Sequence, residues 1–177
     1  MRDNPEIVER KLVTVLFADL VGSTALADEH DPERTRAVLD RFYAEMAAEV
    51  EAVDGTVEKF AGDAVMAAFG APTAHEDHAE RALHAALAMQ RRLREAVDPR
   101  LSLRIGVNTG DVVVDSSRGS SFVTGDAVNV AARLEQGADP DEILVGERTV
   151  AAARSSSASS ERSLPRERNG PSSLVPC

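Results

Sequence analysis

Two aspartates occupy positions from which a carboxylate could bind a metal ion. Asp19 directly follows the apolar run 12–18, which has the composition of a buried strand, and Asp63 follows Ala61-Gly62 between two strand-like runs. Carboxylate oxygens are the ligands that Mg²⁺ prefers, and two carboxylates can hold a pair of such ions. An aspartate at a strand end or in a Gly-Asp turn is also a common capping or turn residue. The pair predicts a metal site only if the fold brings both residues to one place.

The segment just after Asp19 could bind phosphate. Gly22, Ser23 and Thr24 have the composition of a helix start, where backbone N–H groups are free to hold phosphate oxygens. A metal ligand and phosphate-binding N–H groups would then lie side by side.

A third candidate lies on the helix expected near 127–135. Asn129 and Arg133 are four residues apart and therefore project from one face of that helix. An amide and a guanidinium aimed together suit a sugar oxygen and a phosphate charge. The alternative is an ordinary solvent-exposed polar face, although the neighbouring alanines 127, 131 and 132 favour close packing against another element.

The elements that must position these residues alternate between strands and helices. Hydrophobic spacing predicts amphipathic helices over 33–53 and 75–97 and a shorter helix near 127–135. Apolar, β-branched runs predict a hairpin formed by 56–60 and 64–69. Similar runs predict further strands at 12–18, 101–107, 111–114 and 142–145. The runs 101–107 and 111–114 are expected to pair around Asn108-Thr109-Gly110. Hairpins mixed with crossover helices predict an α+β fold with helices packed on a largely antiparallel sheet.

Composition narrows the class of function. The chain has 177 residues, 43% of them hydrophobic and 28% charged, which predicts one main globular domain. Its formal charge of -10 argues against nucleic acid or anionic membrane as a partner, so any phosphate is expected to arrive with metal cations. The single cysteine, no apolar h-region and no long apolar stretch predict a cytoplasmic protein without disulfides or membrane spans.

The expected organisation has three parts. Residues 1–10 are expected to form an N-terminal extension, and 11–153 to form the domain that carries the candidate site. Residues 154–177 are expected to form a disordered tail rich in Ser, Arg and Pro.

Three segments taken together resemble the catalytic domain of class III adenylate and guanylate cyclases of the bacterial type. They are Phe17-Ala18-Asp19-Leu20-Val21-Gly22-Ser23-Thr24, Glu58-Lys59-Phe60-Ala61-Gly62-Asp63, and Gly125-Asp126-Ala127-Val128-Asn129-Val130-Ala131-Ala132-Arg133-Leu134-Glu135. The resemblance covers residues 9–153 and implies the ferredoxin-like βαββαβ core of that family. It also implies a homodimer whose active sites take metal ligands from one chain and the remaining groups from the other.

The resemblance assigns the metal and phosphate positions. It implies that two divalent ions, Mg²⁺ or Mn²⁺, are bound by Asp19, Asp63 and the backbone carbonyl of Leu20. The terminal phosphates of the nucleotide would be held by Gly22, Ser23 and Thr24.

It also assigns the base and the reacting phosphate. Lys59 matches the residue that reads the purine, and Asn129 and Arg133 match the pair that stabilises the transition state. Lysine only donates hydrogen bonds, and adenine N1 is an acceptor where guanine carries a hydrogen. The resemblance therefore implies an adenylate cyclase that converts ATP to 3′,5′-cyclic AMP and pyrophosphate.

The sequence departs from the family at two places. Phe122 stands seven residues before Asn129, where the family has an acceptor such as Asp or Thr, and Thr124 shares the same strand face. The family's later strands, with a phosphate-binding lysine, find no match after the segment 146–153. These departures favour an alternative hypothesis, a weak or inactive cyclase-like module for dimerisation or nucleotide sensing. A guanylate cyclase is disfavoured by Lys59.

Overall fold

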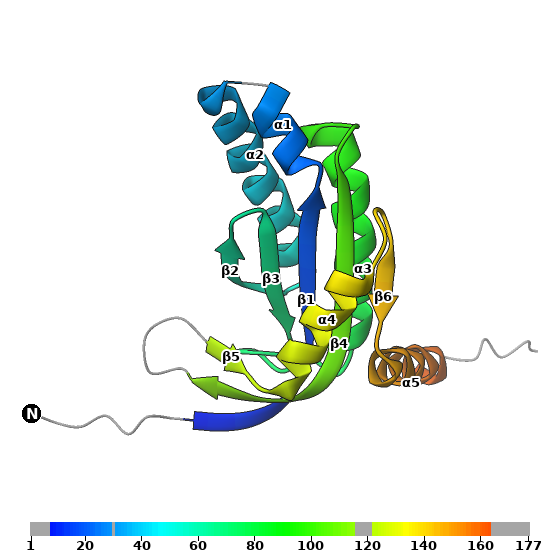
Figure 1. Cartoon of the computed structure of the whole chain (residues 1–177). Coiled ribbons are helices and arrows are strands. Elements are labelled where there is room, and N and C mark those ends of the chain that lie inside the picture. The colour runs from blue at the N-terminus through cyan, green and yellow to red at the C-terminus, as the bar shows by residue number, and fades with distance from the viewer. Residues whose placement is uncertain (1–7, 30, 116–121, 164–177) are drawn as a thin grey trace, which may run out of the picture.

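The computed structural model of the chain describes residues 8–29, 31–115 and 122–163. Its centre is a sheet that runs β2-β3-β1-β4-β5, with β6 paired to β4 (Figure 1). The strands are β1 (Val8–Val21), β2 (Thr56–Ala61), β3 (Ala64–Phe69), β4 (Ser102–Asp115), β5 (Phe122–Thr124) and β6 (Ile143–Val145). Every pairing is antiparallel except the short parallel pairing of β6 with β4. The predicted α+β fold with a largely antiparallel sheet is confirmed.

The helices are α1 (Ser23–Glu29), α2 (Pro32–Glu51), α3 (His78–Arg92) with a π-helical turn at Leu93–Val97, α4 (Asp126–Gly137) and α5 (Glu147–Ser163). The long helices α2 and α3 carry apolar stripes, and α2 also has a side-chain cap. The helix α2 starts where the Asp31 carboxylate accepts a hydrogen bond from the Arg34 amide at 2.9 Å. It buries Phe42, Met46 and Val50, one every four residues, against the sheet.

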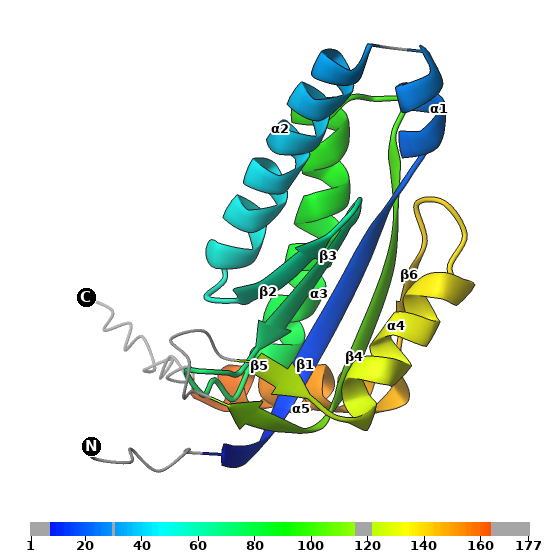
Figure 2. The same ribbon diagram turned by 60° about the vertical axis from the view of Figure 1, so that its left-hand side comes forward.

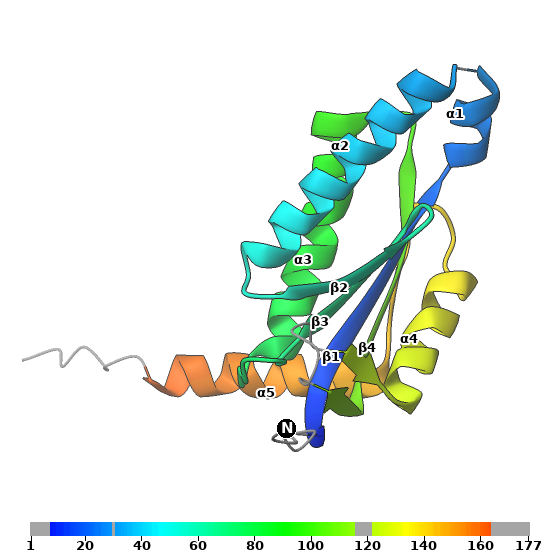
Figure 3. The same cartoon turned by 90° about the vertical axis from the view of Figure 1, so that its left-hand side faces the viewer.

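Alternation along β1 divides the core into two layers. Leu16, Ala18 and Leu20 face the layer that contains α2 and α3, whereas Val13 and Val15 face the layer that contains α4. Figure 2 shows α4 beside β4, and Figure 3 shows α2 and α3 on one side of the sheet with α4 on the other. Asp19 continues the second series and therefore points to the α4 side of the sheet.

The predicted strand pair around Asn108-Thr109-Gly110 is wrong, because β4 runs unbroken through these residues. Asn108 and Thr109 are buried and pair with Val15 and Thr14 of β1 instead of turning. Their polar atoms are satisfied inside the protein: Asn108 donates to the Ala127 carbonyl at 3.2 Å, and the hydroxyls of Thr109 and Thr14 lie 2.7 Å apart. Polar residues with partners can thus occupy a central strand.

The structure also differs from the prediction at both ends of the domain. Strand β1 begins at Val8, and α5 continues to Ser163, so part of the segment expected to be a disordered tail is helical. In this part of the helix serine hydroxyls donate hydrogen bonds to backbone carbonyls one turn earlier, as Ser155 does to Ala151 at 3.0 Å. The rest of the predicted tail lies outside the described residues. Among the described residues, no helix has both the length and the apolar composition needed to cross a bilayer.

Candidate active site

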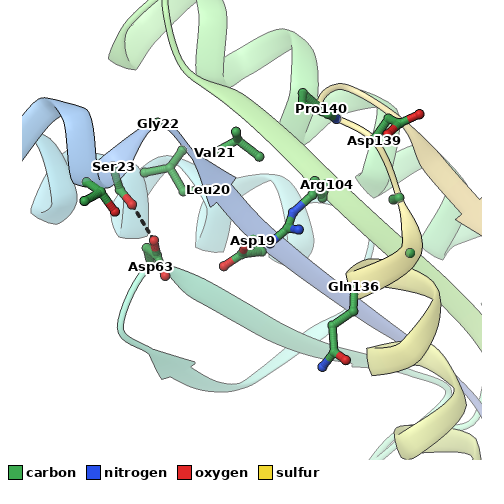
Figure 4. Close-up of a pocket in the computed structure, with 13 residues that line it drawn as sticks. Asp19, Leu20, Val21, Gly22, Ser23, Asp63, Arg104, Gln136, Asp139 and Pro140 are labelled. Atoms are coloured by element: carbon green, nitrogen blue, oxygen red, sulfur yellow. Dashed lines mark hydrogen bonds and ion pairs between the residues drawn. The ribbon is translucent and has the colours of Figure 1, made fainter.

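A pocket of about 550 Å³ opens where β1 ends and α1 begins (Figure 4). Its lining includes residues that the sequence predicted to bind metal and phosphate, together with a loop after α4 and an arginine from β4. The lining residues are Asp19, Leu20, Val21, Gly22, Ser23, Thr24, Asp63, Arg104, Gln136, Gly137, Ala138, Asp139 and Pro140.

The sheet register brings the two aspartates together. Asp19 pairs with Ala64 of β3, the residue directly after Asp63, and the Leu20 amide donates to the Asp63 carbonyl at 3.0 Å. Leu20 is buried, and its backbone ties the end of β1 to the hairpin turn. The Ser23 hydroxyl donates to the Asp63 carboxylate. Gly62 has a φ of 63°, which suits the tight turn that precedes Asp63.

Two charged residues of this site were not predicted. Arg104 of β4 pairs in register with Asp19, and its guanidinium donates to the Asp19 carboxylate. Glu135 of α4 lies 3.5 Å from the same guanidinium and is only 8% exposed. Burial raises the pKa of Glu135, the negative charges of Asp19 and Asp63 raise it further, and Arg104 opposes them. The available signals were a lone arginine in the apolar run 101–107 and a glutamate on the helix face opposite Arg133.

A second, separate pocket of about 300 Å³ contains Lys59, Thr124 and Asn129, together with Met66, Val123, Gly125 and Val128. A β-bulge in β2 explains why Lys59 is there. Val57 pairs with Ala67 and faces the α2 and α3 layer, but the register shifts before Lys59, which pairs with Met66 on the α4 side. The bulge therefore turns Lys59 to the same face as Asn129.

The remaining predicted residues belong to α4 and β5, two elements that also contribute to this second pocket. Arg133 is exposed on α4, one turn beyond the exposed Asn129, and lines neither pocket. Phe122 lies in β5 opposite Asp115, and its side chain is outside the described set. Thr124, two residues on, lines the pocket. The structure thus brings Asp19 and Asp63 together in one pocket, and Lys59, Thr124 and Asn129 together in another.

The first pocket has the donor chemistry that a hard divalent cation requires. Mg²⁺ is commonly held by one or two carboxylates plus phosphate oxygens of a substrate, and Asp19 and Asp63 supply two carboxylates. The Asp19 carboxylate already pairs with a cationic group, the Arg104 guanidinium. Among the described residues no group of three or more His, Cys, Asp or Glu side chains is arranged to hold a metal. The residues fit an ion that completes its coordination with substrate.

Comparisons with known proteins agree with this architecture. The sequence profile of the family described as Adenylate and Guanylate cyclase catalytic domain matches residues 6–169. Adenylate cyclase 1 of Rhizobium meliloti (strain 1021) is 37% identical over 137 residues, which are 71% of this chain and 21% of that protein. The chain therefore spans about a fifth of the length of this relative.

Solved structures with the same fold include cyclases of both specificities. The guanylyl cyclase Cya2 superimposes with a TM-score of 0.75 at 34% identity, covering 82% of this chain and 79% of that one. The adenylyl cyclase CyaB from P. aeruginosa gives 0.76 at 29% identity, covering 84% and 83%. The chain belongs to the adenylate and guanylate cyclase catalytic domain family.

Proposed function

We propose that the chain acts as an adenylate cyclase, which converts ATP to 3′,5′-cyclic AMP and pyrophosphate at the interface of a homodimer. The observation that carries the proposal is the division of the candidate residues between two pockets. Asp19 and Asp63 line one pocket, and Lys59 and Asn129 line the other. Two chains related by a two-fold axis could set the first pocket of each chain against the second pocket of its partner, which would complete two equivalent sites.

The chemistry of the first pocket suits the triphosphate. The reaction joins the ribose 3′ oxygen to the α-phosphorus and breaks the bond from that phosphorus to the oxygen that bridges to the β-phosphate. Divalent ions held by Asp19, Asp63 and the Leu20 carbonyl would activate the 3′ hydroxyl and neutralise the departing pyrophosphate. Gly22, Ser23, Thr24 and Arg104 line the same pocket and could hold phosphate oxygens.

The second pocket would contribute the groups that recognise the base and the reacting phosphate. Asn129 would orient the ribose, and Arg133 would place a positive charge where negative charge develops on the α-phosphate. The bulge that turns Lys59 into this pocket supports its role as the purine reader. A lysine donor matches adenine N1, and Thr124 could accept from the adenine amino group, so ATP is the proposed substrate.

The test is cyclic nucleotide formation by the purified chain supplied with Mn²⁺ and either ATP or GTP, with its association state measured by sedimentation. The expected result is a dimer that forms cyclic AMP from ATP faster than it forms cyclic GMP from GTP. A dimer that turns over only GTP would overturn the base assignment.

The second candidate function is a nucleotide-binding module with little or no turnover. It is favoured by Phe122, which stands where the family has a hydrogen-bond acceptor. A dimer that binds ATP with Mn²⁺ by calorimetry but forms no cyclic product would favour this candidate.

A further inference from the structure

The Arg104 guanidinium lies between two carboxylates that come from different elements. Its Nη2 atom donates to Asp19 Oδ2 of β1 and lies 3.5 Å from Glu135 Oε1 of α4. Within the described residues, two buried atoms here have no hydrogen-bond partner: Arg104 Nε and Glu135 Oε1. An arginine can offer Nε and Nη together to one carboxylate as a bidentate pair. Arg104 Nε and Glu135 Oε1 are therefore available for such a pair, whereas Arg104 Nη2 is engaged with Asp19.

Glu135 is held at this position by the backbone. A Cβ atom built on Gly106 would lie 2.3 Å from the Glu135 nitrogen and 2.3 Å from the Ala131 carbonyl oxygen, so α4 rests directly on β4. Gly106 and Arg104 are two residues apart on the strand and share its α4 face. A carboxylate that is 8% exposed is costly to bury unless a cation is near it, and Arg104 provides that cation.

We infer that Glu135 is a positioning residue of the metal site, which draws Arg104 away from Asp19 and leaves the Asp19 carboxylate free to bind a divalent cation. The inference rests on the proposed function, because it concerns the proposed metal site. A cation at Asp19 and the Arg104 guanidinium compete for one carboxylate and repel each other. Glu135 gives Arg104 a second carboxylate partner. Without it, Asp19 would be the only carboxylate paired with Arg104 among the described residues, and the cation would have to displace the arginine.

The test measures Mn²⁺ binding to the full chain without nucleotide, from the loss of the free-ion electron paramagnetic resonance signal. Glu135→Gln should weaken Mn²⁺ binding about tenfold, a typical effect of changing a residue that supports a metal ligand. Glu51→Gln, the same substitution at an exposed position at the end of α2, is the matched control and should bind like wild type.

A double-mutant cycle with Arg104→Gln separates two ways in which Glu135 could act. If Glu135 acts through Arg104, Glu135→Gln should change Mn²⁺ affinity less than twofold in the Arg104→Gln background. A tenfold loss that persists in that background would overturn the inference, since Glu135 would then attract the ion by its own charge. If Glu135→Gln does not fold, Arg104→Gln alone decides: tighter Mn²⁺ binding than wild type supports competition, and weaker binding contradicts it.

Asp19→Asn distinguishes failure of this inference from failure of the proposed function. If Asp19→Asn binds Mn²⁺ as wild type does, the metal site itself is wrongly assigned, and the inference falls with it. If Asp19→Asn loses Mn²⁺ and Glu135→Gln retains it, the metal site stands and only the role of Glu135 is refuted.

Discussion

Gly106 of β4 lies against the backbone of Glu135, so close that a Cβ atom at position 106 would stand 2.3 Å from the Glu135 nitrogen. This contact fixes the distance between α4 and the sheet, and with it the positions of residues on both faces of the helix. Glu135 lies 3.5 Å from Arg104, which lines the first pocket, and Asn129 lines the second. The close approach of one helix to one strand thus positions a residue beside the first pocket and a residue of the second.

Gly106→Ala should destabilise the protein, because the new methyl group has only backbone atoms to displace. Forcing α4 away from β4 is expected to lower the free energy of unfolding by about 1–3 kcal/mol or more. The matched control is Gly137→Ala in α4, where the added Cβ would meet Leu144 Cδ1 at an ordinary 3.8 Å. Urea unfolding followed by circular dichroism checks both, and equal stability of the two variants would contradict the proposed contact.

Asp19→Ala and Asp63→Ala should each abolish the proposed cyclase activity, because each removes one of the two carboxylates in the first pocket. Loss of several kcal/mol of transition-state stabilisation corresponds to a decrease in turnover of about 100-fold or more. Both variants should keep the circular dichroism spectrum of the wild type, since neither side chain belongs to the hydrophobic core. Near-normal turnover by a correctly folded variant would show that the metal assignment is wrong.

Much of this arrangement could be predicted from local patterns in the sequence. The run 12–18, the hairpin at 56–69 and the glycine before Asp63 predicted correctly that two aspartates lie near strand ends. Those local patterns could not show that these ends meet, because that depends on the pairing of Asp19 with Ala64 across strands far apart in the chain. Only the family resemblance implied one shared metal site. The partnership of Arg104 with Asp19 is non-local in the same way.

Two other features were hidden for different physical reasons. The bulge in β2 leaves no clear pattern, because a single unpaired residue changes which face Lys59 occupies without changing the composition of the strand. Asn108-Thr109-Gly110 reads as a turn because these residue types favour turns. In the structure their polar atoms have buried partners, and Gly110 makes room for Ala127, whose Cβ would lie 2.7 Å from a Cβ at position 110.

Lys59→Glu should reduce turnover of ATP more than turnover of GTP. Glutamate can accept hydrogen bonds from guanine but repels the acceptor edge of adenine. The ratio of kcat/KM values for the two nucleotides is the measured quantity. Lys59→Met is the control, because it keeps a long side chain that neither donates strongly nor carries charge, and it should lower ATP turnover without the same change in ratio. An equal fall for both nucleotides in Lys59→Glu would mean that Lys59 does not read the base.

His78 should make the stability of the fold depend on pH. The side chain is 7% exposed and its Nδ1 lies 2.8 Å from the Thr14 hydroxyl, and burial lowers the pKa of His78, an effect that the charge of Asp77 opposes only in part. A histidine in the unfolded chain takes up a proton below about pH 6.5, whereas the folded protein resists doing so. The free energy of unfolding should therefore fall as the pH drops below about 6.5.

The measurement is the urea midpoint of wild type and His78→Asn between pH 7.5 and 5.5. The midpoint of the wild type should fall more steeply, and His84→Asn, on the exposed side of the same helix, should follow the wild type. Parallel curves for wild type and His78→Asn would show that His78 does not control this dependence.

Two inactive variants should restore activity to each other if the active site is shared between chains. Asp63→Ala damages the first pocket, and Arg133→Ala damages the α4 face that the partner would use, so each homodimer should be inactive. In a mixed dimer one site carries both lesions, whereas the other combines an intact Asp63 from one chain with an intact Arg133 from its partner. Free exchange makes about half of the dimers mixed, each with one intact site, so recovery of about one quarter of wild-type activity is expected.

Mixing Asp19→Ala with Asp63→Ala is the control that should stay inactive, because both lesions fall in the first pocket and no pairing restores it. Exchange is verified by sedimentation and by capture of an untagged chain with a tagged one. Absence of recovery despite verified exchange and an active wild type would mean that both groups act within a single chain.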